Sequence, residues 1–320
     1  MNGESSVGLI MRWNVKMAPN VLLASAMLAF AGLSSGSAVA APASPPAQAP
    51  LEVDVALVLA IDVSGSIDYE EAELQRKGIV DALLSKEVLQ AIQSGSLGRI
   101  GVSAVYFSSR VPGGWMGIPV NWMIVRDQKS AMDFVKTLVA AERHSGRGTS
   151  ISDGLELSVR MLDTGPYRSA KQVIDVSGDG VNNAGRQVLE VRDEVLAKGI
   201  TINALPIMDE TTMQDLDKYF QGCVIGGPGS FVLPAKGFAD FARAMRRKLV
   251  LEISGLRPEE APGGNRLLKK VAATPAQTAP ARPALPRGGY TAKNPPYPGG
   301  CDFPMFGGFG RFRGFGFPER

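Results

Sequence analysis

Five runs of apolar residues predict the strands of one sheet. Four of them are nearly continuous in apolar content and rich in β-branched residues, which is typical of strands covered on both faces. These four span residues 53–61, 100–107, 171–177 and 200–207. The fifth, GIPVNWMIV at 117–125, follows a glycine-rich turn and is expected to form an edge strand through a hairpin.

Between the strands, the apolar positions change to helical spacing. Asp68 followed by Glu71 resembles a capping pair and predicts a helix that runs toward Ile92. Ser150 with Asp153 repeats this pattern before another helix. Further helices are expected at about 129–141, 188–195 and 238–249, the last ending near Gly255. The alternation predicts an α/β fold: a doubly wound, mostly parallel Rossmann-like sheet with one antiparallel edge strand and helices on both faces.

The first 40 residues have the character of a secretory signal peptide. Arg12 and Lys16 precede an apolar stretch of thirteen residues, and the small-x-small pattern after it predicts cleavage after Ala40. The true start could also be Met11 or Met17. A membrane anchor is the alternative, but thirteen apolar residues fall short of the roughly 20 that a spanning helix needs. We therefore expect a periplasmic or secreted protein with no transmembrane span in the mature chain.

Composition divides the mature chain. A Pro/Ala linker at 41–50 leads into the predicted domain at 51–255, and residues 256–320 hold 11 of the 22 prolines and 11 of the 37 glycines. Such a segment cannot bury enough apolar surface to fold, so a disordered tail is expected. The domain carries 22 basic and 26 acidic side chains, whereas the tail carries 10 and 4. The basic excess lies in a tail without a nucleic-acid-binding motif, so we expect no nucleic-acid partner.

Phenylalanine recurs at every third position near the end of the tail, with glycines and arginines between. The five positions are Phe303, Phe306, Phe309, Phe312 and Phe315. An extended polyproline-like chain has three residues per turn and would place all five rings along one edge. One interpretation is composition bias in a disordered segment. The other is an adhesive strip that contacts the envelope or a partner surface.

The chain has two cysteines and one histidine, which argues against a zinc or thiol-catalytic site. Export would permit a disulfide between Cys223 and Cys301, and two unpaired thiols are the alternative. His144 is expected to be a solvated loop residue, because no nucleophile motif accompanies it. Trp115 and Trp122 flank the edge strand and are expected to pack, although Trp115 could be exposed near a binding surface.

Polar side chains gather where the predicted strands end. DVSGS at 62–66 places Asp62, Ser64 and Ser66 at alternate positions, so their oxygens converge on one side of an extended chain. A turn with a helix cap is the simpler interpretation of this stretch alone. However, Thr149 stands at the start of another helix, and Asp179 lies just beyond another strand. Because ligands bind beyond the carboxyl ends of parallel strands, we expect these loops to form one site.

Three hydroxyls and two carboxylates are ligands suited to a hard divalent cation. Oxygen ligands without imidazole or thiolate favour Mg²⁺ or Mn²⁺, with Ca²⁺ a weaker candidate. Two carboxylates balance the charge of one such ion, which would leave it able to accept an anionic oxygen from outside. A nucleotide-binding alternative in GDGVNNAG is weak, because Asn183 stands where the third glycine of that motif is needed.

Residues 51–254 resemble the von Willebrand factor A (vWA) domain with a metal-ion-dependent adhesion site. Asp62, Ser64 and Ser66 match the family's Asp-x-Ser-x-Ser pattern, Thr149 its distant threonine, and Asp179 its final aspartate. The resemblance implies that the hydroxyls touch the metal directly. It also implies that the aspartates act through water, and that a partner's Glu or Asp supplies the last ligand.

One position departs from this pattern. Gly178 stands where the family usually has Thr or Ser, which leaves the choice between Asp179 and Asp175 open. Asn182 and Asn183 could orient bound waters or simply form a turn. VIDVSGDGVNN and CVIGGPGSF further resemble an uncharacterised branch of bacterial vWA proteins, a domain of unknown function.

Two classes of function remain. The first is a metal-dependent binding module that captures an acidic group on a protein or peptide and does no chemistry. The second is a metal-dependent hydrolase acting on an anionic substrate. Hydrolysis needs a general base, but the nearby carboxylates Asp68, Glu70 and Glu71 have the pattern of helix-cap residues. We therefore expect a binding protein, not an enzyme.

Overall fold

The computed structural model describes residues 50–208, 213–256 and 300–301. The predicted signal peptide, nearly all of the linker and the phenylalanine repeat lie outside these residues. Within the described ranges, no helix has the length and apolar character needed to cross a membrane.

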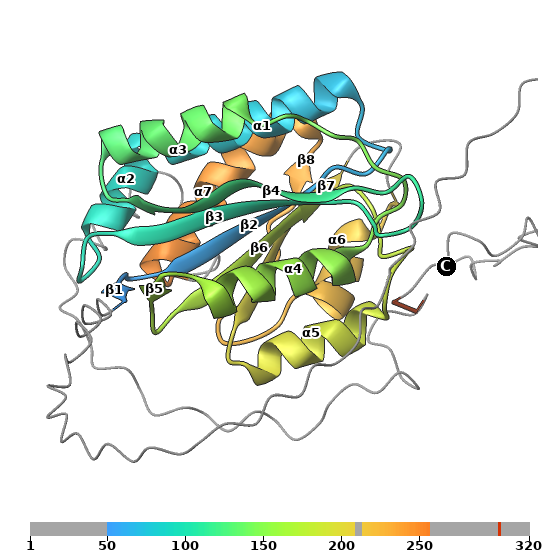
Figure 1. The fold of residues 1–320 in the computed structure, drawn as a ribbon. Coiled ribbons are helices and arrows are strands. Elements are labelled where there is room, and N and C mark those ends of the chain that lie inside the picture. The colour runs from blue at the N-terminus through green and yellow to red at the C-terminus, as the bar shows by residue number, and fades with distance from the viewer. Residues whose placement is uncertain (1–49, 209–212, 257–299, 302–320) are drawn as a thin grey trace, which may run out of the picture. The chain divides into compact units, whose positions relative to one another are not determined.

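A six-stranded sheet forms the centre of the domain, in the order β4-β3-β2-β6-β7-β8 (Figure 1). All neighbouring strands are parallel except β3 and β4, so the predicted fold class and its antiparallel edge strand are confirmed. The strands are β2 (Ala56–Asp62), β3 (Ile100–Phe107), β4 (Met116–Val125), β6 (Gln172–Gly178), β7 (Thr201–Met208) and β8 (Ala235–Lys236). A separate pair, β1 (Leu51–Glu52) and β5 (Tyr167–Arg168), was not predicted.

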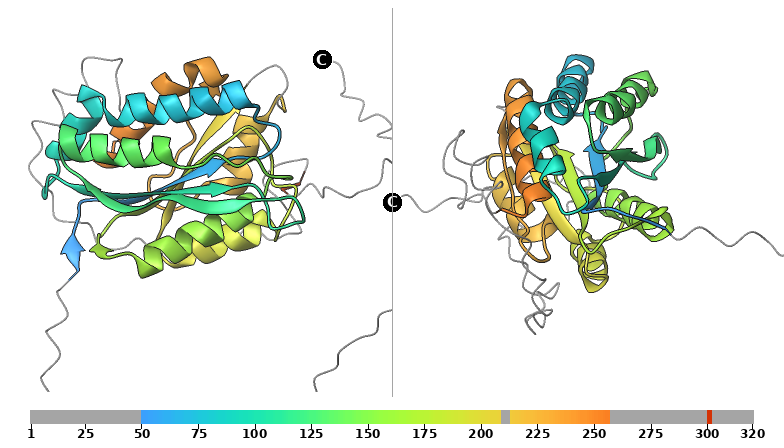
Figure 2. Two further views of the ribbon diagram at one scale, coloured as in Figure 1. Left: turned by 45° about the horizontal axis from the view of Figure 1, so that its top comes forward. Right: turned by 90° about the vertical axis from the view of Figure 1, so that its left-hand side faces the viewer.

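Helices cover both faces of the sheet (Figure 2). One face packs against α1 (Tyr69–Leu83), α2 (Lys86–Gln93), α3 (Gln128–Ala140) and α7 (Phe241–Ser254). The other packs against α4 (Ile151–Thr164), α5 (Val188–Ala197), α6 (Leu216–Tyr219) and the π-helix η1 (Phe220–Val224). Alternate residues of β2 enter the two cores, Leu57 and Leu59 on one side and Val58 and Ala60 on the other. This alternation explains the continuous apolar runs in the sequence.

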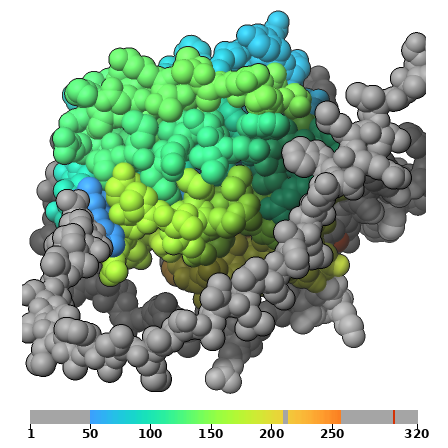
Figure 3. Space-filling model, in the orientation of Figure 1, coloured from blue at the N-terminus to red at the C-terminus, as the bar shows by residue number. Residues whose placement is uncertain are grey.

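Strand β4 lies at the edge of the sheet, and only its Val120 and Val125 are buried. On the face drawn in Figure 3, side chains of β4 lie between those of α3 and α4. Trp122 is partly buried, and its Nε1 donates a hydrogen bond to the carbonyl oxygen of Met161, 2.9 Å away. The expectation that this tryptophan packs is confirmed.

The single helix expected from Asp68 toward Ile92 is wrong. The segment forms two helices, because Ser85 interrupts the first and caps the second. Its Oγ donates to the carbonyl oxygen of Ala82 at 2.7 Å and accepts from the backbone N–H of Val88 at 3.3 Å. This use of a serine hydroxyl on both sides of a break is typical of a helix N-cap.

The last helix also differs at its start. Phe238 belongs to a 3₁₀ turn, η2 (Phe238–Asp240), and α7 begins at Phe241. Its end agrees with the prediction, since Gly255 takes the left-handed conformation with φ 71° that commonly terminates a helix.

The order of the strands creates a switch point beside β2. From β2 the chain adds β3 and β4 on one side, and later β6, β7 and β8 on the other. At such a point the loops that leave neighbouring strands diverge and leave room for a ligand beyond the carboxyl ends. The end of β2 and the loops after β2 and β6 carry four of the five predicted metal ligands, and the fifth, Thr149, lies just before α4.

Candidate metal-binding site

The loop after β2 brings the first three predicted ligands together. Asp62 ends the strand, and its Oδ1 accepts a hydrogen bond from the backbone N–H of Ser64 at 2.7 Å. The hydroxyls of Ser64 and Ser66 are 3.0 Å apart. Asp62 and Ser64 are buried, whereas Ser66 is exposed. The three oxygen-bearing side chains therefore run from the end of the sheet to the surface.

The other two predicted ligands approach this loop from different segments. Asp179 follows β6, and its Oδ1 accepts a hydrogen bond from Ser66 Oγ at 2.9 Å. Thr149 faces the same turn, since a Cβ placed on Gly180 would lie 3.3 Å from its Oγ1. In the loop that leads to Thr149, Gly146 forms an isolated β-bridge with Ser64. All five residues thus lie at one end of the sheet, although they come from three loops.

Two asparagines fix the relative positions of these loops. Asn183 Oδ1 accepts from the backbone N–H of Thr149 at 2.8 Å, and its own N–H donates to the carbonyl of Thr149 at 2.9 Å. Asn182 Oδ1 accepts from the N–H of Ser152 at 3.1 Å. Both side-chain oxygens serve the protein's own backbone, so their role in the structure is to join the β6 turn to the start of α4.

Asp62 has an electrostatic environment that fits a cation. Its burial, and then the charge of Asp179, raise the pKa of Asp62 to about 8, although the N–H and hydroxyl of Ser64 lower it. Its Oδ2 is buried and accepts no hydrogen bond from any described residue. A buried carboxylate oxygen without a donor is costly unless a cation or proton neutralises it. A divalent ion among Asp62, Asp179 and the hydroxyls would do so.

Among the described residues, no three His, Cys, Asp or Glu side chains gather as metal ligands. The candidate site has only two carboxylates and depends on hydroxyls for the rest of its donors. Such a donor set suits Mg²⁺ or Mn²⁺ and is poorly suited to softer metals.

Gly178 allows β6 to approach Asp62 closely. A Cβ at this position would lie 2.8 Å from Asp62 Oδ2 and 3.1 Å from Asp62 Cβ. A threonine or serine here would displace the carboxylate, which gives a physical reason for the departure from the vWA pattern. Asp175 lies within β6, contacts Lys248 and is buried in the core. Asp179 is thus the aspartate that the structure places beside Ser66.

The carboxylates near the site serve as helix caps. Asp68 Oδ1 accepts from the N–H of Glu71, and Glu71 Oε2 accepts from the N–H of Asp68, both at 2.9 Å. This reciprocal capping box confirms the predicted pair. Ser150 caps α4 as predicted, but the side chain of Asp153 contacts Arg110 at 2.9 Å and does not complete a box.

Trp115 and His144 form a contact that the sequence did not indicate. Their rings stack with centroids 4.3 Å apart, and Trp115 also packs against the core. His144 is therefore partly covered by an aromatic ring, although it was expected to be solvated. The glycine-rich turn before β4 and the loop before Thr149 are far apart in sequence, so no local pattern could have indicated this stacking.

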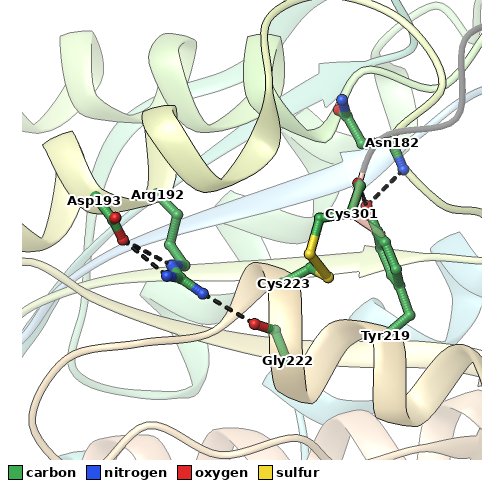
Figure 4. The surroundings of a disulfide bond; sticks show 7 residues. All are labelled: Asn182, Arg192, Asp193, Tyr219, Gly222, Cys223 and Cys301. Carbon is green, nitrogen blue, oxygen red and sulfur yellow. Dashed lines mark hydrogen bonds and ion pairs between the residues drawn. A yellow bond between two sulfur atoms is a disulfide. The ribbon is translucent and has the colours of Figure 1, made fainter. Parts of the chain in front are cut away.

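A disulfide joins Cys223 to Cys301 across 78 residues, and both residues are buried (Figure 4). Tyr219 Oη donates to the carbonyl oxygen of Cys301 and accepts from the backbone N–H of Asn182, each at 2.9 Å. Of the two alternatives left open by the sequence, the structure has the bridge. It connects the C-terminal segment, through Tyr219, to the turn that follows Asp179.

Comparisons with known proteins place the chain in a family and give solved structures of low sequence identity. PTMP1, a proximal thread matrix protein from the mussel byssus, is 16% identical with a TM-score of 0.47, covering 62% of this chain and 47% of PTMP1. The pilus adhesin SpaC from Lactobacillus rhamnosus GG is 16% identical with a TM-score of 0.48, covering 64% of this chain and 31% of SpaC. This chain thus spans about half of PTMP1 and a third of SpaC. One PTMP1 structure has a metal-ion-dependent adhesion site (MIDAS) motif occupied by zinc.

A search of curated proteins gave no match. A family model for a protein of unknown function, DUF1194, matches residues 52–257. This match covers the whole sheet and both layers of helices. The chain therefore belongs to the DUF1194 family.

Proposed function

We propose that this protein is an exported, divalent-metal-dependent binding module that captures an acidic group on a protein or peptide. The observation that carries the proposal is the buried Oδ2 of Asp62, which has no donor among the described residues and lies in a cluster of hydroxyls with Asp179. Mg²⁺ or Mn²⁺ is the expected ion, and Ca²⁺ is a weaker candidate.

The residues of the chain divide this task. Ser64, Ser66 and Thr149 offer neutral oxygens, so Asp62 and Asp179 alone balance the charge of the ion. A bound ion in this setting supplies a Lewis acid that attracts a carboxylate of the partner. Ser66 is the exposed member of the set and faces the side from which a partner would approach.

Hydrolysis of an anionic substrate is the alternative, and it would require a base beside the ion. Asp68 and Glu71 are engaged with each other's backbone in the capping box. This engagement supports binding over hydrolysis.

Calorimetry on the mature full-length chain with Mg²⁺, Mn²⁺ and Ca²⁺ tests metal binding. We expect one site per chain and a rise in melting temperature, because a ligand that binds only the folded state stabilises it. Ser66→Ala should weaken binding without unfolding the protein. Ser96→Ala is the matched control, since Ser96 is also exposed but is no part of the site. A folded protein that shows neither heat nor thermal shift with any of the three ions would refute the proposal.

The partner is tested by crosslinked capture from an envelope fraction, with Mg²⁺ or with EDTA. A specific partner should be retained by the wild-type protein with Mg²⁺ and lost both with EDTA and with Ser66→Ala. A partner that binds equally in all three conditions would show that binding does not depend on the metal site.

We also propose that the phenylalanine repeat at 303–315 contacts the envelope, although it lies outside the described residues. The comparison is between the full-length chain, a truncation after Gly255, and a variant with all five phenylalanines changed to serine. Loss of envelope association in both altered proteins would support the proposal. Equal association of all three would show that the periodicity has no role in it.

A further inference from the structure

Three ionisable side chains meet in the core between β6 and α7, away from the candidate metal site. Asp175 comes from the middle of β6, and Lys248 and Glu252 lie one turn apart on α7. Lys248 is 0% exposed, and the two acidic residues are 1% exposed. The Nζ atom of Lys248 contacts Asp175 Oδ1 and lies 2.5 Å from Glu252 Oε1. An amine is thus enclosed between two carboxyl groups without access to solvent.

The surroundings satisfy these groups only in part. Asn203 Nδ2 donates to Glu252 Oε1 at 2.8 Å, and the ring of Phe231 lies 5.6 Å from Lys248 Nζ. Asp175 Oδ2 and Glu252 Oε2 are buried and accept no hydrogen bond from the described residues. Two carboxylates and one ammonium in such a place would carry a net negative charge. The cost of burying this net charge therefore favours protonation of one of the two carboxyl groups.

Asp175 is the acid whose neutral form is favoured. Burial, and then the charge of Glu252, raise the pKa of Asp175 to about 7, against the opposing effect of Lys248. The protonated form of Asp175 is therefore more favoured than in an exposed aspartate. An amine attacks a carboxylic acid far more readily than a carboxylate, because the carboxylate carbon is shielded by negative charge.

We propose that Lys248 and Asp175 become joined by an amide bond within the folded domain, with Glu252 as the proton-transfer group. Glu252 takes a proton from the ammonium of Lys248, and the freed lone pair of Nζ attacks Cγ of Asp175, forming a C–N bond. A second proton passes from the nitrogen to the departing hydroxyl, so the C–O bond breaks, one water leaves and Glu252 ends protonated. Atoms and charge balance without any oxidant or co-reactant. The fold favours the reaction because it holds the reacting groups next to each other.

Glu252 is suited to proton transfer and Asp175 to attack. Oε1 of Glu252 is held by Asn203 and faces Lys248, so one oxygen has contact with the amine throughout. The carboxyl of Asp175 receives no hydrogen bond from Asn203 or from other described donors on β7. The carboxyl carbon of Asp175 is therefore more accessible to the amine than the carboxyl carbon of Glu252.

Such a bond would join the sheet covalently to one of the helices that cover it. β6 leads directly to Asp179 at the candidate metal site, and α7 is the element from which the C-terminal segment departs. A covalent link between α7 and β6 would keep the helix attached to the sheet when the C-terminal segment is pulled. This inference does not depend on the proposed metal binding.

Mass spectrometry of the full-length chain, reduced to open the Cys223–Cys301 disulfide, tests the proposal. The wild-type protein is expected to be lighter than its sequence by one water. Trypsin should then give the peptide with Asp175, residues 172–186, joined to the peptide that contains Lys248. Glu252→Gln keeps the shape of the side chain but cannot accept the proton, so its mass should equal that of its full sequence.

The exposed pair Lys198 and Asp163, whose atoms are 2.9 Å apart, provides a control within the same digest. Its peptides should be found unjoined, because water surrounds the pair. A wild-type mass equal to the full sequence would overturn the proposal, even if Glu252→Gln fails to fold. A lost water located between Lys248 and Glu252 on the same peptide would overturn the assignment to Asp175.

Discussion

Two aspartates four residues apart, one within strand β6 and one just beyond its end, have different surroundings. Asp175 lies in the core and faces Glu252, with Lys248 between them. Asp179 lies beyond the end of the strand and shares its cluster with Asp62 and the hydroxyl of Ser66. In both clusters, burial and a second carboxylate raise the pKa of one aspartate, to about 7 for Asp175 and about 8 for Asp62.

The two clusters differ in the group that can compensate their carboxylates. The core cluster includes the chain's own amine, and helices seal it from solvent. The cluster at the end of β6 includes hydroxyls, and its exposed serine opens it to an ion from outside. Paired carboxylates inside a fold therefore have two solutions: an internal lysine, which stabilises or reacts, or an external metal, which can bind a partner.

Removing the internal lysine should have the largest effect on stability. Lys248→Met keeps much of the side-chain volume but removes the proposed amide bond and leaves two buried carboxyl groups facing each other, which should cost at least about 3–5 kcal/mol of unfolding free energy. Urea unfolding measures this loss. Lys198→Met, which removes the exposed partner of Asp163, should change stability by less than about 1 kcal/mol. Equal stability of the two variants would mean that Lys248 does not stabilise the core cluster.

Removing the disulfide should have the next largest effect on stability, and it should also loosen the turn beside the candidate metal site. Cys301→Ser frees a segment that closes a loop of 78 residues, and we expect a loss of about 2–4 kcal/mol. The contact of Tyr219 with Cys301 would also be released, so the turn at Asn182 should exchange amide protons faster. Hydrogen exchange by mass spectrometry checks both statements. Unchanged exchange at residues 180–184 would show that the disulfide does not support this turn.

Adding one methyl group tests whether the close approach of Gly178 to Asp62 is needed for metal binding. Gly178→Ala places a Cβ 2.8 Å from Asp62 Oδ2 and should cost about 1–3 kcal/mol and weaken metal binding. Gly65→Ala is the matched control, because its Cβ would lie 3.6 Å from the nearest atom, an ordinary contact distance. Thermal unfolding and calorimetry on both variants give the comparison. Similar metal affinity in the Gly178→Ala and Gly65→Ala variants would show that metal binding does not require a glycine beside Asp62.

Neutralising the outer cluster should weaken metal binding without lowering stability. Asp62→Asn retains an oxygen for the N–H of Ser64 but removes the charge that faces Asp179. We expect Mg²⁺ affinity to fall roughly 10- to 100-fold and the unfolding free energy of the metal-free protein to rise, because a buried charge without a donor is removed. Calorimetry and urea unfolding without metal measure these quantities. A large loss of stability would show that Asp62 has a structural role like that of Asp175.

The sequence predicted the fold because each element carries its own pattern. The strands covered on both faces are continuously apolar, the edge strand is mixed, and the helices have spacing and caps that local residues determine. It also predicted that the segments after β2 and β6 lie close together, since parallel strands place the loops that follow them at the same edge of a sheet. Metal binding itself stays a prediction.

Tertiary structure decided the features that depend on residues far apart in the chain. Lys248 stands beside Arg246 and Arg247, and its burial follows from its place on the same helical face as Phe241 and Met245. That spacing was visible, but the presence of Asp175 opposite it was not. The stacking of His144 on Trp115 and the close approach of Gly178 to Asp62 likewise needed the fold. Local periodicity determines which face of an element is buried, whereas only packing determines which side chains that face meets.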